Sequence, residues 1–233
     1  MSKIFSNEEL KQFNHLIYIG ILGALIILVG DLIMGWGLKD LRIQGIESQI
    51  IQYRDVSDIR MIIASICGFS GVPVAVIGHY AIYKILKAYD VKEAKLYLLG
   101  MLGFLAFGGA GVHVSSIELA YFYKYMTLAN SSIVLSSTLK YAAYFVLPLY
   151  LVLIICWILM VYAHIKVILK ANSPFPKIFI LSSMIVGTMV ASLIGLLGNH
   201  EIINALMVGA FSLGNIWTLV AHLLILPKLN KLD

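Results

Sequence analysis

Charged residues are scarce in this chain of 233 residues: Asp, Glu, Lys and Arg make up 12% of it, whereas hydrophobic residues make up 61%. The mean hydropathy is +0.93. Soluble domains carry about 25% charged residues, so this composition excludes an ordinary soluble domain. It predicts an all-α, polytopic membrane protein.

Cysteine and recognisable catalytic motifs are also rare. The only two cysteines, Cys67 and Cys156, lie inside apolar runs, which predicts small packing residues and no disulfide. The chain lacks a Walker loop, a dinucleotide fingerprint, a His-Glu-x-x-His motif and a nucleophile elbow. These absences weaken an enzymatic reading without excluding one, and we predict no cofactor.

The formal net charge of +5 could indicate a nucleic-acid partner. The basic residues, however, lie at the ends of apolar runs and form no cluster with aromatic residues on a polar face. Such flanking positions are typical of membrane proteins. We therefore expect the partner to be the lipid bilayer and not nucleic acid.

Six apolar runs are long enough to form membrane helices, since a bilayer core needs about 20 apolar residues per helix. We predict one membrane domain over residues 1–233, with helices at about 15–36, 59–86, 94–126, 139–169, 178–197 and 203–226. Ser6 and Glu9 fit a capping box that begins the first helix. The helix at 94–126 carries polar groups on two faces, so it should be the central one.

The longest connector follows the first helix and contains most of the loop charge. Its apolar residues Ile43, Ile46, Ile50 and Tyr53 recur at helical spacing. We predict an amphipathic helix at about 41–54 that lies on the outer membrane surface.

The distribution of basic residues predicts the orientation. With the amino terminus inside, 11 of the 17 Lys and Arg residues lie on that side and six on the other. Because cytoplasmic loops carry the excess of Lys and Arg, both termini are predicted to be cytoplasmic.

Polar residues inside the spans mark the candidate site. Asp31 lies near the outer end of the first predicted helix, and His113 reaches a similar depth in the third, after the glycines of the run Gly108–Gly111. An intramembrane carboxylate costs about 2.5–3.5 kcal/mol on insertion scales unless it is paired or neutral. We expect Asp31 and His113 to pair.

We predict an outward-facing polar pocket around the helix at 94–126. Its candidate ligand-binding residues are Asp31, His113, Ser115, Ser116, Glu118 and His200. Two alternatives stay open: the Asp31–His113 pair as a clasp between helices, and simple solvation of Glu118 and His200 at the interface.

A second polar group lies at the inner side, where His79, His164 and His222 are expected at one depth. Three histidines could bind zinc. No two of them are four residues apart and no carboxylate lies beside them, so we predict no metal site.

Three short patterns carry a resemblance: the run Ile19–Asp31 with its terminal Gly-Asp, Gly78-His79-Tyr80, and Gly111-Val112-His113. They resemble uncharacterised multi-pass bacterial membrane proteins of unknown function. The resemblance implies a location in the bacterial cytoplasmic membrane and about six helices. It implies no activity.

Three hypotheses for function follow. The first is a membrane protein that binds a small or lipid-like ligand in the polar pocket, with transport as its role. The second is an intramembrane hydrolase in which His113, His200 and a carboxylate hold a metal-bound water. The third is a structural or partner-binding protein whose polar residues only join helices.

Overall fold

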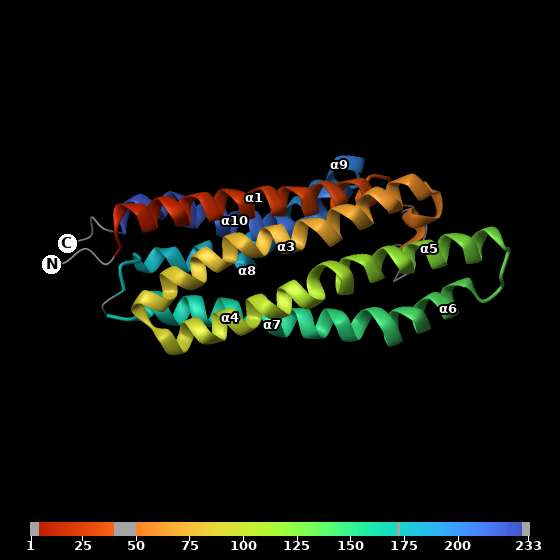
Figure 1. The fold of residues 1–233 in the computed structure, drawn as a ribbon. Coiled ribbons are helices and arrows are strands. Elements are labelled where there is room, and N and C mark those ends of the chain that lie inside the picture. Colours follow the sequence, from red (N-terminus) through yellow and green to blue (C-terminus); the bar gives the residue numbers. More distant parts are fainter. Residues whose placement is uncertain (1–4, 40–49, 172, 230–233) are drawn as a thin grey trace.

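The computed structural model describes residues 5–39, 50–171 and 173–229 as a bundle of helices, with no strand in these ranges (Figure 1). Five helical segments within them are long and apolar enough to cross a membrane. They are α1 (Asn7–Gly35), α3 (Asp58–Tyr89), the rod at Val91–Leu128, the rod at Val134–Leu169, and Ala210–Lys228. The all-helical membrane class predicted from composition is therefore supported.

The two rods are each interrupted by a π-helical segment. The first rod consists of α4 (Val91–Phe107), η2 (Gly108–His113) and α5 (Val114–Leu128). The second consists of α6 (Val134–Tyr141), η3 (Ala142–Val146) and α7 (Leu147–Leu169). Such π segments arise where an extra residue widens one turn, and they are frequent at functional sites.

The fifth predicted helix, at 178–197, is broken into shorter pieces. It consists of η4 (Lys177–Ser182), α8 (Met184–Ser192) and η5 (Leu193–Leu197), and only a short apolar helix results. The break at Ser183 frees two carbonyls, which side chains of the last helix satisfy: Trp217 donates to Leu181 at 2.7 Å and Thr218 to Ser182 at 2.9 Å. Broken helices persist in membranes where neighbours supply such partners.

The sixth predicted helix, at 203–226, is divided at Gly209. Its pieces are α9 (Glu201–Val208) and α10 (Ala210–Ile225), followed by η6 (Leu226–Lys228). The count of six continuous spans is thus reduced to five candidate spans and one short apolar helix among the described residues.

The connector after α1 is only partly described. Residues 41–49 of the amphipathic helix predicted at 41–54 lie outside the described residues. The next residues form η1 (Ile51–Asp55), a 3-10 helix. Burial raises the pKa of Tyr53 in this segment to about 12.

Two rows of small residues join α1 to α3. Gly20 and Gly23 on α1 meet Gly71, Ala75 and Gly78 on α3, and an added Cβ at Gly23 would lie 2.2 Å from the Ala75 nitrogen. Small residues at helical spacing let two backbones approach closely in a membrane. This seam fixes α3 against α1.

The central helix is α3, and the prediction that the helix at 94–126 would be central is wrong. α3 packs against α1, α4, α5, α7 and α10, and it crosses between the two layers of the bundle in Figure 1. The small residues of α3 explain this, because only a helix with little side-chain bulk can have close neighbours on several sides.

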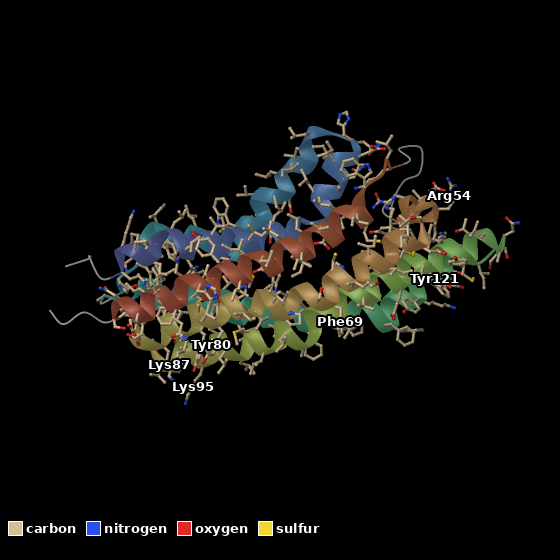
Figure 2. All side chains as sticks on the ribbon, turned by 45° about the horizontal axis from the view of Figure 1, so that its top comes forward. Arg54, Phe69, Tyr80, Lys87, Lys95 and Tyr121 are labelled. Atoms are coloured by element: carbon tan, nitrogen blue, oxygen red, sulfur yellow. The ribbon has the colours of Figure 1, made fainter. Side chains whose placement is uncertain are left out.

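The first and last helices meet at one end of the bundle. α1 begins and η6 ends at that end (Figure 1), where the predicted capping box is confirmed: Ser6 accepts from the Glu9 N–H at 3.1 Å and donates its own N–H to the Glu9 carboxylate at 2.8 Å. Lys87 and Lys95 lie at the same end and Arg54 at the opposite end (Figure 2). We call the first the terminal end and the second the distal end.

We expect Gly23→Ala to destabilise the protein by about 2 kcal/mol. Alanine gains about 1 kcal/mol of helix propensity, but its methyl group would have to displace backbone atoms of α3, and overpacking of this kind costs up to about 3 kcal/mol or more. Unfolding of the purified protein in mixed detergent micelles measures the difference. Gly37→Ala is the control, because nothing lies within 4 Å of its added Cβ; equal stability of the two variants would contradict the seam.

Candidate functional site

Asp31 lies in the last turns of α1 and points into the bundle. Its side chain is buried, with a residue exposure of 9%. One carboxylate oxygen, Oδ2, accepts a hydrogen bond from the Ser212 hydroxyl on α10 at 2.5 Å. The other, Oδ1, lies 3.3 Å from Nδ1 of His113. The structure therefore brings Asp31 and His113 together and adds Ser212 as a partner that sequence reasoning missed.

His113 is the last residue of the π segment η2. Its second ring nitrogen, Nε2, lies 3.0 Å from the carbonyl oxygen of Ala64 on α3. The ring fills a slot in which a Cβ added to Gly68 would lie 2.0 Å from a ring carbon, and a Cβ added to Gly30 would lie 3.4 Å from Nε2. Only glycine at position 68 leaves room for the imidazole between the helices.

These contacts determine how many protons the pair holds. The Ala64 carbonyl only accepts, so Nε2 must carry a proton and donate it. The remaining nitrogen, Nδ1, faces a carboxylate oxygen, and one proton between them gives either an ion pair or two neutral groups. Both forms have zero net charge, which suits a site without bulk water.

The π segment is built from residues with poor helix propensity. Gly108, Gly109 and Gly111 precede His113, and glycine costs about 1 kcal/mol relative to alanine in a helix. Gly109 also lies against α3, where an added Cβ would be 2.9 Å from the Gly68 carbonyl oxygen. The glycines therefore allow both the widened turn and the close approach that seats the histidine ring.

A cavity of about 150 Å³ lies beside the pair. In another protein, an engineered cavity of this size binds one benzene molecule. Its walls come from α1, η1, α3, the first rod, α7 and the last two helices. Its polar lining residues are Asp31, Tyr53, His113, Ser116, Tyr150, Trp157, Ser212 and Asn215.

Most of the cavity lining is apolar. It includes aliphatic and aromatic residues, among them Ile27, Met34, Val72, Phe104, Leu153 and Phe211. Trp157 also lines the cavity, and its indole N–H is buried and has no hydrogen-bond partner among the described residues. The geometry suits a small amphipathic molecule whose polar group accepts a hydrogen bond.

The other predicted site residues are divided between the cavity and its surroundings. Ser116 lines the cavity, and its hydroxyl lies 3.3 Å from that of Tyr150. Ser115 is buried but donates to the Val112 carbonyl at 3.2 Å, outside the cavity lining. Glu118 is exposed and accepts from Tyr141 at 3.0 Å.

His200 does not join the site either. It is exposed in the link before α9, at the distal end of the bundle. The neighbouring residues of that link hold the end of α1: Glu201 accepts from the Trp36 indole at 3.1 Å, and Asn204 donates to the Gly37 carbonyl at 2.7 Å. The link therefore has a structural role in this arrangement.

Several lining residues were not predicted. Ser212 and Asn215 are buried on one face of α10, and the spacing of polar residues at 212, 215, 218 and 222 in an apolar run could have indicated this face. Tyr150 and Trp157 come from α7, and single aromatic residues in an apolar run do not mark a site. Their spacing of seven residues places them on one side of that helix.

The fold and the site together define a class: a helical protein with apolar helices of membrane-spanning length and a buried carboxylate–imidazole pair at the wall of an internal cavity. The chain belongs to a family of unknown function, DUF6796, whose model matches residues 1–229. No curated protein and no solved structure matches the chain. Function must therefore be inferred from the geometry.

Asp31→Asn should preserve the fold, whereas Asp31→Ala should lower the free energy of unfolding by about 3 kcal/mol. The asparagine amide can donate to neutral His113, and its oxygen can still accept from Ser212, so both contacts survive. Alanine leaves both partners buried and unpaired.

Unfolding in mixed micelles compares the two variants, with the exposed Asp55→Asn as the matched control. Equal losses for Asn and Ala at position 31 would show that the site needs the negative charge itself. That result would contradict the expected tolerance of asparagine and would identify the ion pair as the form of the site.

Proposed function

We propose that this chain is a multi-pass protein of the bacterial cytoplasmic membrane that binds a small or lipid-like ligand in the cavity beside Asp31 and His113, with transport as its role. Both termini would lie in the cytoplasm, so the distal end would face outward. The excess of lysine and arginine on the terminal side supports this orientation, and Lys87 and Lys95 lie at that end in Figure 2.

The observation that carries the proposal is the cavity with both a protonatable pair and an unpartnered donor on its wall. A cavity that results only from imperfect packing would have an apolar lining. Here Asp31, His113 and Trp157 converge on about 150 Å³ of space. Such convergence in a mostly apolar pocket is typical of a ligand site.

The position of the cavity supports access from the outer side and from the bilayer. Tyr53 of η1, which follows the outer connector, forms part of the wall. Phe211 and Ile154 line the cavity and are also more than 40% exposed on the apolar surface of the bundle. A ligand dissolved in the membrane could therefore enter past these two side chains.

The alternative of a metal-dependent hydrolase has less support. His113 lies inside the bundle with a side-chain exposure of 11%, whereas His200 is exposed in the link before α9. Within residues 5–39, 50–171 and 173–229, no three His, Cys, Asp or Glu side chains form a cluster suited to a metal ion. The hydrolase hypothesis thus has no described ligand set.

Photolabelling tests the ligand site. The probe is an alkyl alcohol of about five carbons that carries a diazirine, a size matched to a cavity that could hold benzene. We expect light-dependent labelling of the wild-type protein on the α7 and α10 segments of the wall. Val72→Phe should abolish this labelling, because Val72 lines the cavity and the larger ring would fill it.

Val152→Phe provides the matched control. Val152 lies on α7 with 37% exposure and does not line the cavity, so labelling should be unchanged in this variant. Equal labelling of the wild type and Val72→Phe would contradict the proposal. Peptide mapping by mass spectrometry distinguishes wall segments from the lipid-facing surface.

A further inference from the structure

Two buried stripes of polar residues lead from the cavity towards the terminal end. On α7, Tyr150, Trp157 and His164 recur every seven residues. On α10, the stripe consists of Ser212, Asn215, Thr218 and His222. Both spacings place the members of a stripe on one side of their helix.

Ring contacts join α7 to α10 at two levels. The rings of Trp157 and Phe211 meet near the cavity with 5.0 Å between centroids. The rings of His164 and His222 meet at 4.8 Å. Ser212 and His222 are ten residues apart, so the stripes extend about 15 Å from the cavity along α10.

The middle of the α10 stripe is hydrogen-bonded to α3 and α4. Asn215 lies with its Oδ1 atom 2.6 Å from Nε2 of His79, so this nitrogen donates, and Nδ1 of His79 accepts from the Tyr97 hydroxyl at 2.7 Å. Asn215 also lines the cavity. These groups connect α3, α4 and α10 beside the cavity.

The histidine pair is different, because it has unused nitrogens. Nδ1 of His222 donates to the Thr218 carbonyl at 2.8 Å, which leaves Nε2 with a free lone pair. Nε2 of His222 and Nε2 of His164 are both buried and have no partner among the described residues. The exposed fractions of these residues are 0% and 2%, so no bulk solvent reaches them.

Other buried polar atoms without a described partner flank this pair. They are Trp157 Nε1 on the cavity side, and the Tyr89 hydroxyl and Glu93 Oε2 on the terminal side. Polar groups that only join helices would be satisfied by each other, whereas buried groups without protein partners in natural proteins usually hold ordered water. Each of these unsatisfied atoms is therefore a place for an ordered water.

Charged groups lie beyond the histidine pair at the terminal end. The Phe175 ring lies between the histidines and Tyr89, with centroids 6.4 Å from His164 and 6.2 Å from Tyr89. Beyond it, Asp90 forms an ion pair with Lys170, and the Lys170 ammonium holds the pKa of the Asp90 carboxyl below its usual range. Lys177 donates to the Ile168 carbonyl at 2.8 Å.

We propose that these stripes form a proton path that links the Asp31–His113 pair to the terminal end of the bundle. The proton between His113 Nδ1 and Asp31 passes to a cavity water as one N–H or O–H bond breaks and one O–H bond forms, and a proton that enters the outward-facing cavity from the distal side replaces it, so the pair returns to zero net charge. Water carries it to Nε2 of His222 and then of His164, and Glu93 and Tyr89 deliver it to the solvent. The proposal goes beyond ligand binding, because the two relay histidines, His164 and His222, lie outside the cavity lining.

Proton flux into liposomes tests the path. The full chain is reconstituted into vesicles that contain a pH-sensitive dye, and a potassium gradient with valinomycin drives protons inward. We expect flux through the wild type, and a fall of at least about tenfold in His164→Phe, because a ring without nitrogens cannot relay protons. Phenylalanine should fit, since the His164 ring already lies 5.7 Å from that of Phe179.

His222→Asn is the second variant, because its amide can still donate to the Thr218 carbonyl while it lacks the imidazole that relays protons. Exposed His15→Phe is the matched control and should conduct like the wild type. Absence of flux in the wild type, or unchanged flux in both variants, overturns the path. Neither histidine lines the cavity, so photolabelling should persist in both variants, and failure of the path remains distinguishable from failure of the ligand site.

Discussion

The single proton shared by Asp31 and His113 determines what the surrounding helices must supply. A bilayer core offers no water to a bare carboxylate, so both groups need protein partners. The Ala64 carbonyl fixes one ring nitrogen of the histidine, and the Ser212 hydroxyl binds the second carboxylate oxygen. Three helices and one π segment therefore have to meet at one point.

The glycines make this meeting possible. Gly23 allows α1 to contact the backbone of α3, and Gly68 leaves the space that the His113 ring fills. The widened turn of η2 then supplies the extra residue before His113. Glycine lowers the helix propensity of each segment. The same glycines stabilise the contact between the helices, since close packing is the main attraction between helices in lipid.

The sequence predicts the class and the depth of the key residues well, because these depend on composition and on rise per residue. The rise per residue places Asp31 and His113 at the same depth in their two helices. The Ser6 capping box depends on four adjacent residues. Local rules suffice for such features.

The sequence does not predict features that depend on partners from distant helices. The break at Ser183 persists because Trp217 and Thr218 supply donors to the freed carbonyls, and nothing in the apolar run at 178–197 indicates those donors. The choice of α3 as the central helix depends likewise on which small residues face each other. Ser212 belongs to the site through its contact with Asp31 and its place in the cavity wall, and both depend on how α10 packs against α1.

A clasp between helices does not by itself account for Asp31. Hydrogen bonds between membrane helices contribute about 0.6 kcal/mol on average, whereas an intramembrane carboxylate costs about 2.5–3.5 kcal/mol on insertion scales. Apolar packing would join α1 to α10 at lower cost, as replacement of buried ion pairs by apolar groups often shows. Asp31 lies instead where a cavity and a polar stripe meet, with Ser212 common to both. A group that gains or loses one proton at that junction could couple the occupancy of the cavity to the protonation of the stripe, which an apolar contact could not do.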